Sequence, residues 1–134
     1  MIHLDTSFLV DLLRTSPRGR VAAGSAVLAR LEDEELAISV YVACELQAGA
    51  ALSTEPERER RRVAELCQGL EVVLPDDSFA ERYGSLFSQL EKRGERIATM
   101  DLLIATAALG AGAPLVTRNP RHFQRVPGLR LISY

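Results

Sequence analysis

Three acidic residues stand in apolar surroundings where solvation alone does not account for them: Asp5, Glu45 and Asp101. Asp101 shares a helical stripe with Ile97 and Ile104, and apolar residues flank Glu45 at helical spacing. A carboxylate buried without a partner is strongly destabilising. If the three acids converge, a divalent cation between them would relieve their mutual repulsion. An all-oxygen ligand set favours Mg²⁺, for which Mn²⁺ can substitute.

Such a cation could bind a phosphodiester, generate hydroxide and stabilise a leaving oxygen.

Each acid also has an ordinary structural explanation that the sequence leaves open. Asp5 could cap a helix, Asp101 could form an interhelical hydrogen bond, and Glu45 could be structural. Other polar residues are expected to be structural: Asp11, Asp76 and Asp77 as surface or capping carboxylates, residues 57–62 as a solvated helix face, and His3 and His122 in packing or structural roles.

The elements that would position these acids follow from the apolar pattern. Strands are expected at residues 1–4, 36–40, 70–75, 114–117 and 129–133. Helices are expected at residues 8–13, after N-cap candidates at 5–7, and at 21–35, 41–51, 57–68, 79–92 and 99–109, with a break at 16–19 and a turn at 119–120. Short apolar strands separated by helices predict a parallel sheet covered on both faces. Ligands bind such sheets beyond the carboxyl ends of the strands, where Asp5, Glu45 and Asn119 stand.

The composition is that of one globular domain spanning residues 1–134. The chain has 16 Lys and Arg against 18 Asp and Glu, a net charge of -2, and 47% hydrophobic residues. These values exclude a polycation and a disordered chain. Residues 102–134 carry four arginines and no acid, or +4, which leaves -6 for the rest. The near-neutral total therefore conceals a basic region beside an acidic one.

Neither an export signal nor a run of 18 apolar residues is visible, so a cytoplasmic protein without a membrane segment is expected. Cys44 and Cys67 lack the spacing of a metal or redox motif. They are interpreted as reduced packing residues.

Four blocks of the sequence resemble the PIN-domain toxins of the VapC type: residues 2–13, 39–49, 94–108 and 115–123. The blocks include Leu-Asp-Thr-Ser at residues 4–7 and Met-Asp-Leu-Leu-Ile-Ala at residues 100–105. The resemblance implies a three-layer α/β/α sandwich around a central parallel sheet of four to five strands. It also implies a Mg²⁺-dependent endoribonuclease of a type II toxin-antitoxin system, neutralised by a VapB-type antitoxin and usually homodimeric.

The resemblance also assigns roles to individual residues. Asp5, Glu45 and Asp101 match the first three acids of the family, whereas the fourth acidic position is Asn119, a neutral ligand that leaves one or two metal ions open. Asp5 and Asp101 would hold the metal, and Glu45 would complete its shell or orient the attacking water. Metal hydroxide would attack in line and leave a 5′-phosphate and a 3′-hydroxyl. The supporting residues are Thr6, Thr117 and Asn119 around the carboxylates and phosphate, and Arg118 and Arg121 on the RNA backbone.

The sequence is also compatible with other functions. A catalytically inactive PIN-like domain could bind RNA or a protein partner. A phosphatase with an aspartyl nucleophile would need a second Asp where Ser7 stands, and a phosphorelay receiver would need a lysine after a strand, whereas Lys92 follows none. The apolar helices within residues 21–51 fit either a groove for an antitoxin segment or a filled core. The identity of the RNA is not readable from the sequence.

Overall fold

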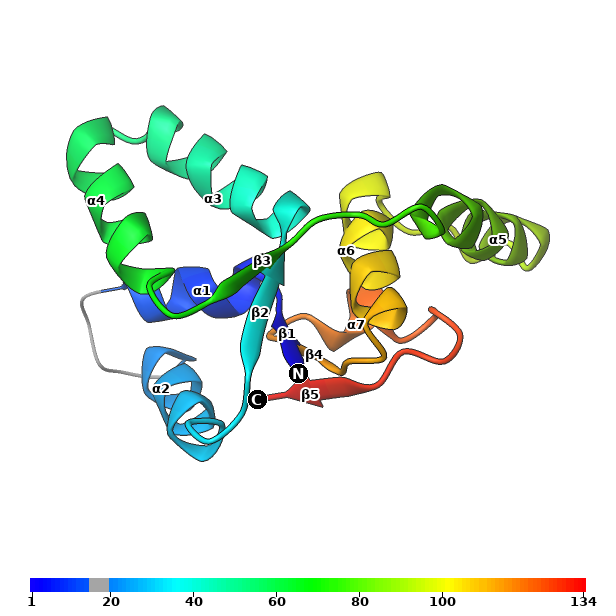
Figure 1. The fold of residues 1–134 in the computed structure, drawn as a ribbon, viewed down its shortest axis with the longest axis horizontal. Coiled ribbons are helices and arrows are strands. Elements are labelled where there is room, and N and C mark those ends of the chain that lie inside the picture. The colour runs from blue at the N-terminus through cyan, green and yellow to red at the C-terminus, as the bar shows by residue number, and fades with distance from the viewer. Residues whose placement is uncertain (15–19) are drawn as a thin grey trace.

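The computed structural model describes residues 1–14 and 20–134, so the break expected at residues 16–19 lies outside the described residues. Five strands form one sheet, and each strand runs parallel to its neighbours. The order across the sheet is β3-β2-β1-β4-β5 (Figure 1). The strands are β1 (Ile2–Leu4), β2 (Leu36–Ser39), β3 (Glu71–Val73), β4 (Leu115–Thr117) and β5 (Leu131–Ser133).

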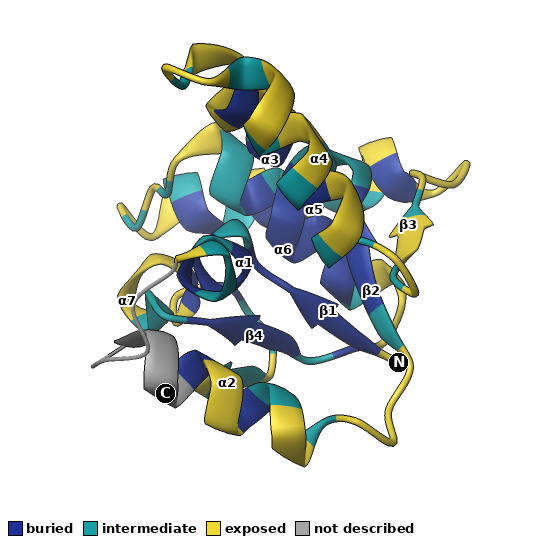
Figure 2. Ribbon diagram, turned by 90° about the vertical axis from the view of Figure 1, so that its left-hand side faces the viewer, coloured by how far each residue is buried: buried dark blue, intermediate teal, exposed yellow. Residues whose placement is uncertain are grey.

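Helices cover both faces of this sheet, which confirms the predicted α/β/α sandwich (Figures 1 and 2). One side carries α1 (Thr6–Leu13), α2 (Arg20–Arg30) and α4 (Pro56–Leu66), with α3 (Val40–Leu52) packed against α4. The other side carries α5 (Phe79–Lys92), α6 (Thr99–Gly110) and the short α7 (Pro120–Phe123). Crossover helices are required here because parallel neighbours cannot be joined by tight hairpins.

The core lies between the two central strands and the helices that cover them. Every residue of β1 and β4 is buried, as Figure 2 shows, whereas α4 presents an exposed outer face. The largest fully buried apolar side chains include Leu4, Phe8, Ile38, Ile104 and Phe123. Parallel strands that are covered on both faces must be apolar on both, which explains why β1 and β4 read as continuous apolar runs.

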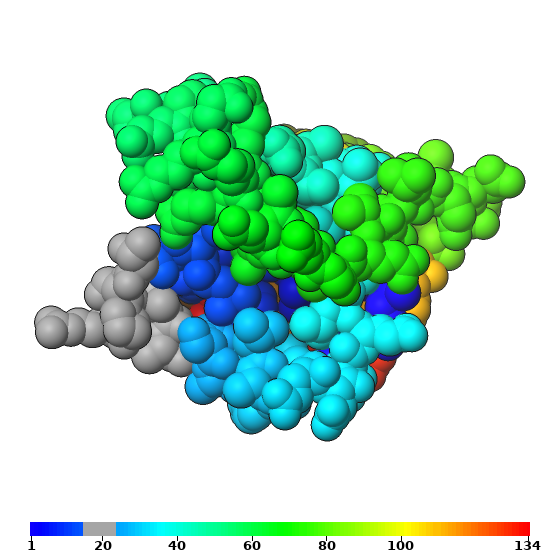
Figure 3. Space-filling model, turned by 60° about the vertical axis from the view of Figure 1, so that its left-hand side comes forward, coloured from blue at the N-terminus to red at the C-terminus, as the bar shows by residue number. Residues whose placement is uncertain are grey.

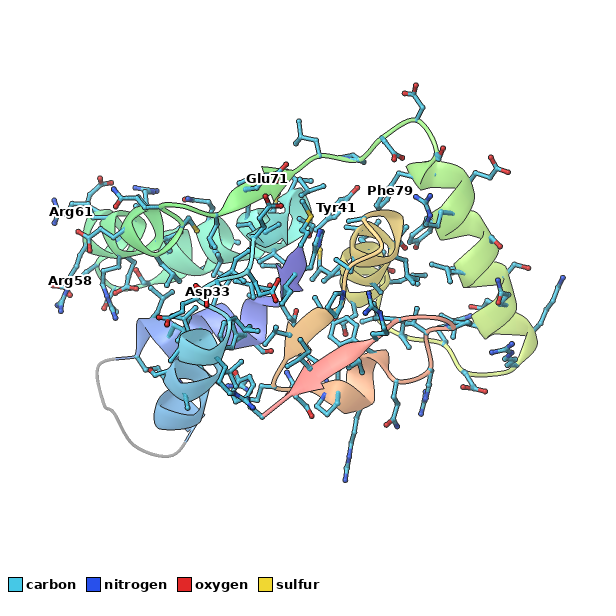
Figure 4. The ribbon with its side chains drawn as sticks, turned by 60° about the horizontal axis from the view of Figure 1, so that its bottom comes forward. Asp33, Tyr41, Arg58, Arg61, Glu71 and Phe79 are labelled. Carbon is cyan, nitrogen blue, oxygen red and sulfur yellow. The ribbon has the colours of Figure 1, made fainter. Side chains whose placement is uncertain are left out.

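Several side chains can be compared directly with their sequence-based expectations. His3 is buried as predicted, and burial lowers the pKa of its imidazole. Arg58 and Arg61 extend from α4 away from the body of the molecule, in keeping with a solvated helix face (Figure 4). The expectation for Cys44 is wrong, because this thiol is exposed on α3 rather than packed.

Some boundaries also differ from the prediction. The expected turn at residues 119–120 is the start of α7, because Pro120 occupies the first helical position, where its fixed φ is favourable. The expected end of α5 is confirmed, since Gly94 follows it with a φ of 66° that a residue with a side chain rarely adopts. Within the described part of the chain, no helix is both long and apolar enough to cross a membrane.

Candidate active site at the carboxyl edge of the sheet

Asp5 follows β1 directly and is the N-cap of α1. Its Oδ1 accepts a hydrogen bond of 2.9 Å from the backbone N–H of Thr6. Its Oδ2 accepts bonds of 2.8 Å from the hydroxyls of Ser7 and Thr117. A carboxylate has about four acceptor positions, so these three donors leave one of them open on Oδ1. Asp5 therefore caps the helix and still has an oxygen available for a ligand.

The end of β4 is tied to the same carboxylate. β1 and β4 are adjacent, with Leu4 opposite Val116, so the residues that follow them emerge at the same edge. The Thr117 hydroxyl that donates to Asp5 also accepts the backbone N–H of Asn119 at 3.0 Å. Asn119 is thereby held close to Asp5 through its main chain.

Glu45 reaches the site from α3. Its Oε1 accepts a bond of 2.6 Å from the hydroxyl of Thr6, and the residue is half-buried. Thr6 is the residue whose backbone N–H binds Asp5, so one residue orients two of the acids. Among the described residues no donor is bound to the second oxygen of Glu45, which leaves this oxygen available.

Asp101 lies in the first turn of α6 with 23% of its side chain exposed, and its Oδ2 is 3.3 Å from Nδ1 of His122. Burial raises the pKa of the Asp101 carboxyl. The neighbouring His122 lowers that pKa, while the charges of Asp5 and Glu45 raise it. The charges of Asp5, at the start of α1, and Glu45, on α3, therefore act on Asp101, on α6.

The donor set fits a hard divalent cation. Within the described residues, no three of the His, Cys, Asp and Glu side chains are close enough to form a ready-made metal cage. Glu45 and Asp101 nevertheless each keep one oxygen without a donor, Asp5 keeps one open acceptor position on Oδ1, and none of the three is paired with a Lys or Arg of the described chain. Mg²⁺ commonly binds through one or two carboxylates and retains several waters, so an open arrangement of oxygen donors suits it.

Asp11 contradicts its sequence-based expectation as a surface or capping carboxylate, because it is completely buried. Its Oδ1 accepts a bond of 2.7 Å from Nη1 of Arg118, and its Oδ2 accepts one of 2.6 Å from the Tyr134 hydroxyl. The guanidinium expected on the RNA backbone is thus engaged inside the protein. Arg121, by contrast, is exposed on α7.

Ser7 is a site residue that the sequence reasoning did not identify. Its buried hydroxyl donates to Asp5 and accepts the backbone N–H of Arg118 at 3.1 Å. The available signal was its position two residues after Asp5, where a Ser side chain can reach back to the capping carboxylate.

The model of the PIN domain family matches residues 2–129. Ribonuclease VapC1 of Haemophilus influenzae strain R2866 is 31% identical over 127 residues, covering 95% of this chain and 92% of the relative. The tRNA(fMet)-specific endonuclease VapC of Salmonella typhimurium is 34% identical over 101 residues, covering 75% and 76%. The chain therefore belongs to the PIN-domain family.

A solved structure narrows this classification. VapBC2 from Rickettsia felis, bound to a DNA fragment from their promoter, superimposes with a TM-score of 0.89 at 32% identity, covering 99% of this chain and 98% of that one. Within the PIN-domain family, this chain is of the VapC type, as the four sequence blocks predicted.

Proposed function

We propose that this chain is the endoribonuclease toxin of a VapBC-type toxin-antitoxin pair and that it hydrolyses RNA phosphodiester bonds with the help of Mg²⁺. The observation that carries the proposal is that Thr6 binds both Asp5 and Glu45 at the carboxyl edge of the sheet, and that the charges of these two acids act on Asp101. Relatives that carry ribonuclease names support the RNA substrate. An RNA substrate in turn implies action in the cytoplasm.

Asp5 and Asp101 would hold the cation, with Glu45 as the third candidate ligand. Bound Mg²⁺ would supply positive charge for the phosphate and lower the pKa of a water. Ser7 and Thr117 hold Asp5 by its Oδ2, so its Oδ1 presents the open acceptor position. Glu45, held by Thr6 at one oxygen, can orient the attacking water with the other.

The phosphate side of the site is supplied by the segment that follows β4. Asn119 offers a neutral amide beside the acids, suited to the scissile phosphate or to a weak metal contact. Arg121 is exposed on α7 and can contact the RNA backbone by charge-assisted hydrogen bonds. The sequence-based proposal of the same role for Arg118 would require its guanidinium to leave Asp11.

The test is cleavage of end-labelled RNA by the purified protein with Mg²⁺ and with EDTA. Asp5→Asn and Asp101→Asn should each lower the rate by about 100-fold or more, because removing even a supporting partner of a metal site costs about 10- to 100-fold. The exposed Asp77 gives the matched control, Asp77→Asn, which should cleave at the parent rate. Equal rates for the parent and both site variants would refute the assignment.

Calorimetry with Mn²⁺ separates this function from the alternative of a catalytically inactive PIN-like domain. A metal-dependent enzyme should give a saturable signal that Asp101→Asn weakens. A domain whose acids serve only its fold should give none. Total tRNA is the first substrate to try, since a Salmonella relative is named a tRNA(fMet)-specific endonuclease.

The antitoxin would occupy a groove of about 600 Å³ between α2 and α4, which we name the leucine groove. Figure 3 shows this hollow between the segment of α2 and β2 and the segment of α4 and β3. Its lining combines an apolar floor with an acidic rim, namely Leu4, Leu9, Leu12, Leu28, Leu36, Leu66 and Leu70 with Glu32, Glu34, Glu35 and Glu71. Such a groove suits an amphipathic segment with basic flanks.

Some apolar residues within 21–51 line the leucine groove, and others belong to the core. Leu28 and Leu36 are only half-buried and line the leucine groove, whereas Val27 and Val42 belong to the core. The structural neighbour from Rickettsia felis is a VapBC assembly, which supports a VapB-type partner here. We also propose a homodimer, to be checked by light scattering of the toxin and of its complex.

A further inference from the structure

A hydrogen-bonded network links the buried Asp11 to the partly buried Arg118 and Tyr134, which are far apart in the sequence. Asp11 has no exposed surface, and each of its oxygens accepts one bond, from Nη1 of Arg118 at 2.7 Å and from the Tyr134 hydroxyl at 2.6 Å. Arg14 adds a longer contact of 3.9 Å to the same Oδ1. The Tyr134 ring packs edge-on against Phe8, with centroids 5.5 Å apart. Neither oxygen of this buried carboxylate is left without a donor.

Arg118 is held by α1 at both of its ends. Its backbone N–H donates to the Ser7 hydroxyl at 3.1 Å, and its guanidinium donates to Asp11. Ser7 and Asp11 are four residues apart, so they lie on one face of α1. The residue that directly follows β4 is thereby fixed in two places along that face.

The same contacts converge on Asp5. The Ser7 hydroxyl that accepts from Arg118 donates to Asp5 Oδ2, and Thr117, the residue before Arg118, donates to the same oxygen. A shift of Arg118 would therefore disturb both hydroxyls that orient Oδ2. The network acts on the carboxylate without contacting it directly.

We infer that Asp11 and Tyr134 are positioning residues, which hold Arg118 and the end of β4 in the arrangement that lets Ser7 and Thr117 orient Asp5. The inference rests on the proposed ribonuclease function, and it gives Arg118 a positioning role in place of RNA binding. The Asp11 carboxylate is completely buried and the Arg118 guanidinium is 21% exposed, so loss of Arg118 would leave a buried charge uncompensated. Tyr134 completes the network from β5, at the edge of the sheet.

The first test is Tyr134→Phe, which removes one hydroxyl and keeps the ring that packs on Phe8. We expect kcat to fall by about tenfold, the range typical for a lost supporting hydrogen bond, while KM for the RNA stays within about twofold. Tyr83→Phe on α5 is the matched control, because Tyr83 has no hydrogen bond to another described side chain. A parental kcat for Tyr134→Phe overturns the inference.

The second test is Arg118→Gln, compared with Arg93→Gln at the exposed end of α5. A positioning role predicts a lower kcat with an unchanged KM and an unchanged salt dependence of RNA binding. An RNA-binding role predicts a higher KM and a weaker salt dependence. The second result would overturn the reassignment of Arg118.

Mn²⁺ affinity gives a readout that does not depend on cleavage. Tyr134→Phe should weaken Mn²⁺ binding several-fold relative to Tyr83→Phe, at a temperature where circular dichroism shows both to be folded. If the parent binds Mn²⁺ but cleaves no RNA, the proposed function fails and this comparison still decides the inference. An unchanged Mn²⁺ affinity in Tyr134→Phe, with only a lower melting temperature, would reduce the network to a structural one.

Discussion

The hydroxyl of Thr6 donates a 2.6 Å hydrogen bond to Oε1 of Glu45 and so connects α1 to α3, 39 residues further along the chain. The backbone N–H of the same residue binds Oδ1 of Asp5. Thr6 therefore fixes Asp5, the N-cap of α1, and Glu45, on α3, relative to each other. Its two bonds leave the second oxygen of Glu45 and part of Asp5 Oδ1 available to a ligand.

This geometry predicts different effects for two substitutions of Thr6. Thr6→Val keeps the shape and the backbone donor but removes the hydroxyl, so Glu45 loses its orienting partner. We expect the cleavage rate to fall by about tenfold. Thr6→Ser keeps the hydroxyl and should retain most of the rate. Single-turnover cleavage measures both, and a Thr6→Val variant as fast as Thr6→Ser would show that this bond has no role in the reaction.

Asp101 leads to a prediction about stability and pH in the metal-free protein. Burial raises its pKa above the ordinary value of 3.8, and the charges of Asp5 and Glu45 add to the increase, so the folded state binds this proton more readily than the unfolded state does. Stability from this group therefore falls as pH rises from the ordinary pKa through the raised one. Asp101→Asn should melt a few degrees higher than the parent near neutral pH, and the gap should close in acid.

Thermal unfolding in EDTA, from about pH 4 to about pH 8, measures this difference. Asp77→Asn, at an exposed position, is the control and should show no pH-dependent gap. A parent that is more stable than Asp101→Asn at neutral pH would contradict the electrostatic argument. Added Mg²⁺ should stabilise the parent more than the variant, because a ligand stabilises the state that binds it and Asp101→Asn should bind it more weakly.

The fold could be predicted from the sequence because short apolar strands alternate with longer helices, and every expected strand is present. Strand lengths could not be predicted, since a strand extends only as far as it pairs with a neighbouring strand in the sheet. The apolar run at residues 70–75 forms a strand only to Val73, which pairs with Ser39. Ser39 is also the N-cap of α3, so the partner strand ends there and the ladder ends with it.

Glu45 and Asp101 could be recognised as candidates from the sequence, because a carboxylate with apolar neighbours at helical spacing needs a partner. Asp11 lies in the same kind of apolar surroundings, next to Phe8 and Leu12, and its complete burial shows that the surface or capping role expected for it is wrong. Its partners are 107 and 123 residues away, beyond any local pattern. Likewise, periodicity cannot show that Ser7 and Thr117 share one oxygen of Asp5.

The acidic rim of the leucine groove predicts how charge affects antitoxin binding. Glu34→Lys and Glu35→Lys should each weaken binding of the cognate VapB-type antitoxin by up to about fivefold, the range for exposed ion pairs. The effect should shrink at high salt. Glu81→Lys on α5, outside the groove, is the matched control. Calorimetric titration measures all three, and equal affinities would exclude the rim from the interface.

Replacing Asn119 by Asp would increase the negative charge of the candidate metal site. The backbone N–H of Asn119 is bound to the Thr117 hydroxyl that holds Asp5, so its side chain leaves the main chain close to Asp5. Asn119→Asp would add a fourth carboxylate near the expected cation. An additional negative charge near the cation should strengthen its binding by about 1.4 kcal/mol or more, which is about tenfold or more in Mn²⁺ affinity.

Titration of Asn119→Asp with Mn²⁺ tests this increase, and Gln89→Glu on α5 adds the same charge far from the acids as a control. Only Asn119→Asp should bind more tightly. In the absence of metal, the added charge should raise the pKa of Asp101 further, so Asn119→Asp should also be less stable than the parent at neutral pH. Tighter binding together with lower metal-free stability would mean that position 119 faces the same space as Asp5 and Asp101, whereas no change in either would separate it from the metal site.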